Sequence, residues 1–165
     1  MLRIIGRYGQ YILNILSVFL LINKNTYLSF YIVGTIINTI INFILKYIFQ
    51  DPRPDEDIPL FELALHNDKL IDVDRYGMPS DLSQSTGFSC IFIFLVNSNI
   101  YVRWIYLIVS LLTMLESYKS KKHTISQIII GYFVGIIIGA IVYIISNKFI
   151  KGKITGKKDD FCFIY

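Results

Sequence analysis

The sequence predicts an all-α protein, a polytopic membrane helix bundle with about five transmembrane helices and one large polar loop. Of its 165 residues, 54% are hydrophobic and only 17% are charged, whereas soluble domains carry about 25% charged residues. The mean hydropathy is +0.54. The charges are also bunched, which leaves uncharged stretches of roughly the 17–25 residues that a helix needs to span a bilayer. This composition excludes an ordinary soluble enzyme, a disordered tail and a secreted disulfide scaffold.

Each apolar stretch is assigned to one membrane helix. In chain order the five expected helices are Tyr8–Ile22, Tyr27–Phe49, Leu82–Val96, Tyr101–Leu115 and Ile125–Ser146. The first and fourth are short for a full crossing. Ser80 stands at the N-cap position of the third, and Thr124 or His123 at that of the fifth. The last helix carries glycine at every fourth position, a spacing that permits close helix packing. These glycines are Gly131, Gly135 and Gly139.

The segment 50–81 is the only long polar stretch between the expected helices. It holds nine of the twelve acidic residues against three basic ones. Prolines at positions 52, 54 and 59 prevent a long regular helix in its first part, and Ile58–Leu65 is expected to form one short amphipathic helix at the membrane surface. With five crossings, this segment, the N-terminus and the 116–123 loop lie on one side of the membrane. The basic residues divide evenly between the two sides, so they do not orient the chain.

The whole chain 1–165 is interpreted as a single integral membrane domain that ends in a basic tail at 147–165. The net charge is +4. Basic residues beside membrane helices usually contact anionic lipid or anchor the helix end. Membrane lipid is therefore the expected partner, and nucleic acid is not, because no soluble module is present to hold a duplex. No metal ligand set is recognised, and no cofactor is expected.

Three short sequence runs carry residue types that can bind or attack a phosphate. All three are expected on the same side of the membrane as the polar segment. Lys46 and Arg53 lie in KYIFQDPRP, Ser80 lies in RYGMPSDLSQ, and His123 lies in SYKSKKHTISQ. Lysine and arginine are suited to phosphate oxygens, and a helix N-terminus such as that at Ser80 favours an anion. An imidazole on a neighbouring loop can attack phosphorus as a nucleophile. Simpler roles stay open for each residue taken alone: a helix-end lysine, an arginine paired with the acidic segment, a helix cap and a loop histidine.

The three runs resemble the motifs of the type 2 phosphatidic acid phosphatase superfamily, which read K-x6-RP, PSGH and SR-x5-H-x3-D. Lys46, Arg53 and Pro54 match the first motif at full spacing. The closest resemblance is to the dolichyl-diphosphate phosphatase branch, with YGMPS-x-H-S-Q and YHT-x-SQ. Members of that branch tend to carry Gln where the wider family has Asp, and Gln127 stands at that position. The resemblance covers about 42–146.

This resemblance implies an acid-phosphatase mechanism without metal or cofactor. His123 would attack phosphorus and form a phosphohistidine, and Gln127 would belong to the same catalytic group. Lys46, Arg53 and Ser80 would hold the phosphoryl oxygens. The implied substrate is a lipid phosphate or a polyprenyl diphosphate. The protein would be a multi-pass integral membrane protein, in an endomembrane such as the endoplasmic reticulum if the dolichyl branch holds.

The chain departs from these motifs at three site positions. Leu82 replaces the general-acid histidine, and Ser117 replaces the phosphate-binding arginine of the third motif. Asp81 stands where Gly or Ser is usual, and two hypotheses remain for it: its carboxylate partly occupies the anion site, or it points to water. Loss of general acid–base catalysis typically lowers a rate by about 10²–10⁴-fold, so the activity is expected to be impaired.

Two other functions are left open by the sequence. The first is a catalytically inactive family member that binds lipid head groups or a membrane partner. The second is a structural or transport-associated membrane protein whose acidic segment binds cations. The acids of segment 50–81 could attract Ca²⁺, but they lack a regular ligand spacing.

Overall fold

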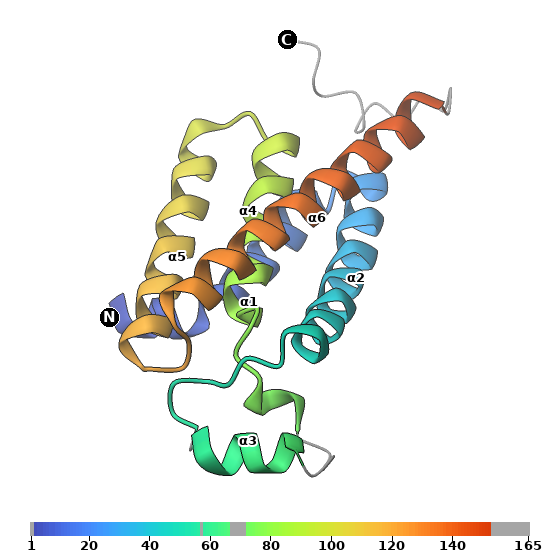
Figure 1. Cartoon of the computed structure of the whole chain (residues 1–165). Helices are drawn as coiled ribbons and strands as arrows, with labels where there is room; N and C mark the ends of the chain where they lie inside the picture. The colour runs from blue at the N-terminus through green and yellow to red at the C-terminus, as the bar shows by residue number, and fades with distance from the viewer. Residues whose placement is uncertain (1, 57, 67–71, 153–165) are drawn as a thin grey trace.

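The computed structural model describes residues 2–56, 58–66 and 72–152, which form an all-helical bundle (Figure 1). In chain order the elements are α1 (Leu2–Leu21), α2 (Asn25–Phe49), α3 (Ile58–His66), the 3-10 turn η1 (Val73–Arg75), α4 (Asp81–Val96), α5 (Ile100–Lys119) and α6 (Ile125–Gly152). Four helices, α1, α2, α5 and α6, are long and apolar enough to cross a membrane. The predicted all-α bundle is confirmed.

Helix α4 differs from the other predicted membrane helices because it forms the centre of the bundle. With 16 residues it extends about 24 Å at the usual helical rise, less than the roughly 30 Å of the hydrocarbon core. Eleven of its residues are buried, and it packs against α1, α2, α5 and α6 (Figure 1). We therefore regard α4 as a core helix that the four longer helices shield from lipid.

Three helix boundaries extend well beyond their predicted positions. Helix α1 begins at Leu2 instead of position 8, α5 ends at Lys119 instead of position 115, and α6 ends at Gly152 instead of position 146. The residues added to α1 and α5 include four charged ones, Arg3, Arg7, Glu116 and Lys119, and the added turns are joined by an ion pair of 3.1 Å between Arg3 Nε and Glu116 Oε1. Charged side chains at a helix end can reach the interface, so the end of an uncharged stretch underestimates helix length.

The glycines of α6 allow it to cross α4 at very close range. A Cβ atom on Gly131 would lie 2.6 Å from the Ser80 carbonyl oxygen, and one on Gly139 would lie 2.7 Å from that of Phe88. A Cβ on Gly135 would collide with the Gln84 carbonyl. The close packing predicted from the glycine spacing is confirmed. It brings the first turn of α6 against the first turn of α4.

The polar segment lies at one end of the bundle, together with the N-termini of α1, α4 and α6 and the C-termini of α2 and α5 (Figure 1). Its short helix α3 confirms the helix expected at 58–65, and Phe61 anchors it by packing edge-on against Tyr76. The chain on either side pairs in antiparallel fashion: Arg53 N–H donates to the Arg75 carbonyl at 3.3 Å, and Gly77 N–H donates to the Asp51 carbonyl at 2.6 Å. This pairing brings the segment beginning at Asp51 beside the segment that enters α4.

Candidate active site

The imidazole of His123 is buried between the 77–81 segment and the start of α6, with only 2% of the residue exposed. Its Nδ1 lies 2.9 Å from the carbonyl oxygen of Gly77. A carbonyl can only accept a hydrogen bond, so Nδ1 carries a proton and donates. The other nitrogen, Nε2, is thereby set as the atom available to a ligand or a second partner. This is the tautomer that a nucleophilic Nε2 requires.

The partner that Nε2 meets is the carboxylate of Asp81, at 3.5 Å from Oδ1. Asp81 begins α4, and half of its side chain (49%) is exposed. The partial burial of the carboxyl among the helix ends raises its pKa, but the hydrogen bond with His123 and the charges of Lys46, His123 and Arg53 outweigh burial and hold the pKa well below its usual range. Asp81 is therefore an anion near two cationic side chains, Lys46 and Arg53, and in contact with the imidazole of His123.

The two cations expected to bind phosphate both lie near this carboxylate. Lys46, in the last turn of α2, is 2% exposed and lines a cavity together with Asp81. Arg53 acts on Asp81 through its charge, and within the described part of the chain its buried Nε has no hydrogen-bond partner. An unpaired buried donor is costly, so this arginine is suited to an acceptor that the chain itself does not supply there.

Two cavities lie near His123 and Asp81, and each is lined by only part of the expected site. A cavity of about 120 Å³ is lined by Lys46 and Asp81, and by polar residues of α1, α2 and α4. A second, more open cavity of about 410 Å³ is lined by His123, Lys121 and Pro54 and by residues at the start of α6. In this arrangement the lysine and the histidine face different spaces. The Asp81 carboxylate, which lines the first cavity, contacts the ring of His123, which lines the second.

Gln127 is fully buried, and its side-chain amide forms hydrogen bonds with groups other than the His123 ring. Its Nε2 donates to Asp51 Oδ2 at 2.6 Å and to the Pro52 carbonyl at 2.9 Å, while Oε1 accepts from Thr124 N–H at 3.0 Å. Both amide protons are thus engaged. A Cβ on Gly77 would collide with this amide. Gln127 therefore acts on His123 indirectly. It binds Asp51 and Pro52, Asp51 in turn pairs with Gly77, and the Gly77 carbonyl accepts from the His123 ring.

The remaining predicted residues take structural positions around this centre. Ser80 is the N-cap of α4 and accepts from Ser83 N–H at 3.5 Å, while its own N–H donates to the Gln127 carbonyl at 3.1 Å. Leu82 is partly buried in the first turn of α4. Ser117 is buried in α5, and its Oγ has no hydrogen-bond partner among the described residues. Neither Leu82 nor Ser117 supplies the charge or the proton of the residue that it replaces.

A buried amide network below the site was not recognised in the sequence. Asn42 Nδ2 donates to Gln84 Oε1 at 2.8 Å and to the Pro79 carbonyl at 3.3 Å, and Gln84 Nε2 donates to Asn38 Oδ1 at 3.0 Å. The signal was present, because positions 38, 42 and 46 recur every four residues on one face of an otherwise apolar helix. Polar residues inside membrane helices face the bundle interior, which identifies this face of α2 as the inner one.

A protein-family model described as the PAP2 superfamily matches residues 27–151, which include every site residue named above. The chain belongs to the PAP2 superfamily. Neither the curated proteins nor the solved structures contain a match. Superfamily membership and four membrane-length helices together identify an integral, multi-pass, phosphatase-like membrane protein.

The PAP2 match begins earlier than the resemblance at 42–146 and so includes nearly all of α2. Within the described ranges, no three His, Cys, Asp or Glu side chains gather as a metal site would require. Asp57 and Asp68, two acids of the segment for which a cation-binding role was considered, lie outside the described residues.

Proposed function

We propose that this PAP2 superfamily member binds lipid phosphates at the membrane surface and hydrolyses them slowly through a phosphohistidine at His123. The observation that carries the proposal is the convergence of Lys46, Arg53 and His123 on the Asp81 carboxylate. Three groups of this kind around one anion make a site for a phosphoryl group. The site opens at the end of the bundle where the helices meet water, which suits a substrate whose tail stays in the bilayer.

The chemistry follows from the orientation of His123. With Nδ1–H fixed on Gly77, the lone pair of Nε2 attacks phosphorus, and the bond from phosphorus to the leaving oxygen breaks. Water then hydrolyses the phosphohistidine and releases inorganic phosphate. Lys46 and Arg53 neutralise charge on the equatorial oxygens in both steps. Because Leu82 cannot donate a proton, the leaving oxygen has to take its proton from water, and the first step is slowed.

A polyprenyl diphosphate is the substrate that this altered site handles best. Its leaving group is a phosphate, which departs without prior protonation far more readily than the alkoxide of a simple lipid monoester. The missing general acid therefore matters least for a diphosphate. The YGMPS and HT-x-SQ runs around Ser80 and His123 support the same branch, that of the dolichyl-diphosphate phosphatases, and with it an endomembrane location.

The test is phosphate release by the purified full-length protein in detergent, with dolichyl diphosphate, phosphatidic acid and an aryl phosphate as substrates. We expect slow release that is fastest with the diphosphate and abolished in His123→Ala and Lys46→Ala. Alkaline trapping of labelled phosphate on His123 identifies the intermediate. Absence of both phosphate release and vanadate binding would refute the proposed function.

The second candidate is an inactive member that binds lipid head groups, favoured by Leu82, by Ser117 and by the contact between Asp81 and Nε2. It predicts vanadate binding that depends on Lys46 and Arg53 but no phosphate release by the wild type. Leu82→His combined with Ser117→Arg is then expected to produce measurable turnover. A rise of about 10²-fold or more over the wild type corresponds to recovery of general acid catalysis. A double variant that binds vanadate yet stays inactive would show that further positions silence the site.

A further inference from the structure

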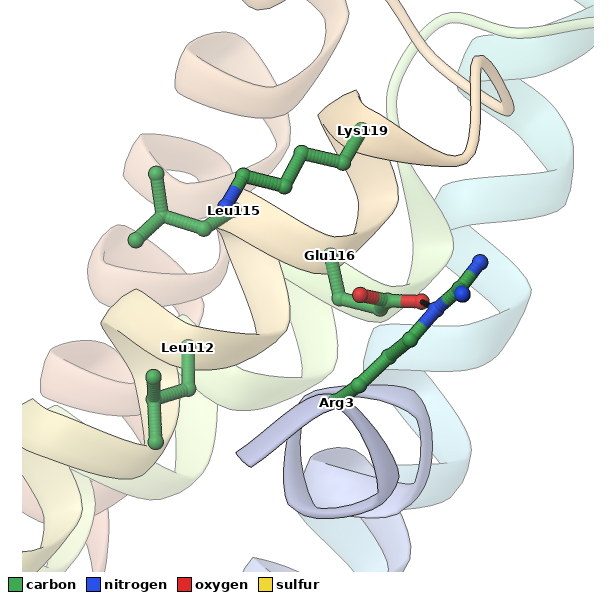
Figure 2. A pocket seen from close by; sticks show the side chains of 5 residues that line it. All are labelled: Arg3, Leu112, Leu115, Glu116 and Lys119. Atoms are coloured by element: carbon green, nitrogen blue, oxygen red, sulfur yellow. Dashed lines mark hydrogen bonds and ion pairs between the residues drawn. The ribbon is translucent and has the colours of Figure 1, made fainter. Parts of the chain in front are cut away.

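A second basic site lies away from His123, where the N-terminal end of α1 meets the C-terminal end of α5. A cavity of about 400 Å³ lies there, and Figure 2 shows that its lining combines charged with apolar side chains. Its lining residues are Arg3, Leu112, Leu115, Glu116 and Lys119. A second cavity of about 300 Å³ continues from Arg3 along α1, lined also by Ile4, Arg7 and Tyr8.

The floor of this groove is rigid because α1 and α5 pack closely beneath it. A Cβ on Gly6 would lie 2.6 Å from the Leu112 carbonyl oxygen and 2.8 Å from Glu116 Cβ. One turn farther on, a Cβ on Gly9 would collide with the hydroxyl of Thr113. The groove therefore lies over a tightly packed pair of helices.

The charges of the groove are unbalanced. Glu116 is its one described acid, and that carboxylate is already paired with Arg3 Nε at 3.1 Å. The outer nitrogens of Arg3 extend beyond the carboxylate, and Lys119 reaches back along α5 over Leu115 (Figure 2). Arg7 adds a third cation in the adjoining cavity. The net charge of the four side chains is +2, at the end of the bundle where α1 begins and α5 ends.

The apolar half of the groove faces outward. Leu115, Ile4 and Tyr8 are 53%, 65% and 52% exposed, as expected of side chains that contact acyl chains in a membrane helix. Cationic and exposed apolar side chains thus lie side by side in the groove, as binding of the head group and an acyl chain of one phospholipid would require. A zwitterionic head group fits less well, because its own cation would approach Lys119 and Arg7. Basic pockets between membrane helices are known to bind anionic head groups.

We infer that this groove, defined by Arg3, Arg7, Leu115 and Lys119, binds an anionic phospholipid as a structural ligand. On binding, the exposed side chains of Arg3 and Lys119, which point in opposite directions in Figure 2, turn toward one lipid phosphate, and one acyl chain runs along Leu115. The inference does not depend on the proposed phosphatase function, because none of these residues belongs to the His123 site. By contacting both helices, the lipid stabilises the junction of α1 with α5.

The test uses the full-length protein in detergent, with phosphatidylglycerol and phosphatidylcholine of equal chain length as competing ligands counted by native mass spectrometry. Phosphatidylglycerol carries a phosphodiester, so its binding is separate from that of a phosphomonoester at His123. The wild type is expected to retain phosphatidylglycerol in preference to phosphatidylcholine. Arg7→Gln with Lys119→Gln is expected to lower that preference by about fivefold for each cation removed.

The matched control removes two positive charges outside the groove, in Lys122→Gln with Lys148→Gln, and is expected to keep the wild-type preference. Glu116→Gln removes the one acid and is expected to increase phosphatidylglycerol retention. Equal losses in the groove variant and the control would overturn the inference and indicate diffuse attraction to a basic surface. Equal retention of both lipids by the wild type would overturn it as well. Thermal unfolding of each variant identifies any that fail to fold, and single Lys119→Gln then replaces the double variant.

Discussion

The Nε2 atom of His123 lies 3.5 Å from a carboxylate oxygen of Asp81, while Nδ1 of the same ring is held by the Gly77 carbonyl at 2.9 Å. Both ring nitrogens therefore face oxygen acceptors. A doubly protonated imidazolium satisfies both of them, but it has no lone pair with which to attack phosphorus. Asp81 thus opposes the chemistry for which the ring is otherwise oriented, and we predict that its carboxylate competes with a phosphate oxygen for this position.

Removing the Asp81 carboxylate is expected to strengthen anion binding. Asp81→Gly and Asp81→Asn should each raise vanadate affinity about tenfold or more, because a charge pair at about 4 Å is worth between about 1 and 4 kcal/mol in partly exposed surroundings. Calorimetric titration of the purified protein measures the change. Glu56→Gln, which removes an acid paired with Arg75 at the same end of the bundle, is the control. Unchanged affinity in both Asp81 variants would mean that the carboxylate does not compete with phosphate.

The depressed pKa of Asp81 predicts how stability depends on pH. The folded-state pKa lies below the unfolded value of about 3.9. The contribution of the ionised carboxylate is therefore complete well above that value and is lost as the pH falls through the lower folded-state pKa. The difference in melting temperature between wild type and Asp81→Asn should stay constant from about pH 7 to pH 5 and shrink below about pH 4. A difference that already shrinks between pH 7 and pH 5 would contradict this assignment.

Gln127 is expected to act on stability through its buried amide. Gln127→Met keeps the length of the side chain but leaves Asp51 Oδ2 and the Thr124 N–H without their partner. A buried polar group left unpaired costs about 1–3 kcal/mol, so thermal unfolding in detergent should occur several degrees lower. Ser126→Ala, an exposed change one residue away, is the control. Equal melting temperatures for Gln127→Met and the wild type would show that these hydrogen bonds contribute nothing to folding.

The crossing of α4 and α6 is expected to be intolerant of a single added methyl group. Gly135→Ala places a Cβ against the Gln84 carbonyl, and overpacking of this kind destabilises by about 1–3 kcal/mol. Because Gln84 belongs to the network below Lys46, the same change should also weaken vanadate binding. Ile137→Ala, on the lipid-facing side of α6, should leave binding unchanged. If a folded Gly135→Ala protein binds vanadate as tightly as the wild type, the packing of α4 against α6 does not affect anion binding at the site.

Lys121 is expected to supply part of the charge lost with the arginine of the third motif. It lines the same cavity as His123, whereas Ser117 offers only a buried hydroxyl. Lys121→Gln should weaken vanadate binding severalfold, because an exposed cation near a bound anion contributes modestly. Lys122→Gln removes an equal charge one residue along and should have a smaller effect. If the two variants weaken vanadate binding equally, Lys121 contributes only as part of the general surface charge.

Much of the fold and some of the site could be predicted from the sequence because the signals are local. Charge-free stretches locate membrane helices, glycine at every fourth position predicts the close crossing of α6, and Ser80 marks the start of α4. Lys46, Arg53 and His123 could be predicted as neighbours because their motifs follow one another in the expected order and lie on the same predicted side of the membrane. The superfamily match confirms the family, though not the branch.

By itself, the amino-acid sequence determined that the chain is a membrane bundle with its phosphate-binding residue types at one end. Only the tertiary structure decided what each side chain touches. Gln127 was predicted to belong to the same catalytic group as His123; its amide binds the Asp51 and Pro52 segment, and the Gly77 carbonyl is the acceptor that orients the His123 ring. Asp81 faces Nε2 because the glycines of α6 bring two helix ends into contact. The reason is physical: helix formation and membrane insertion depend on residues nearby in the chain, whereas hydrogen-bond partners depend on how distant helices cross.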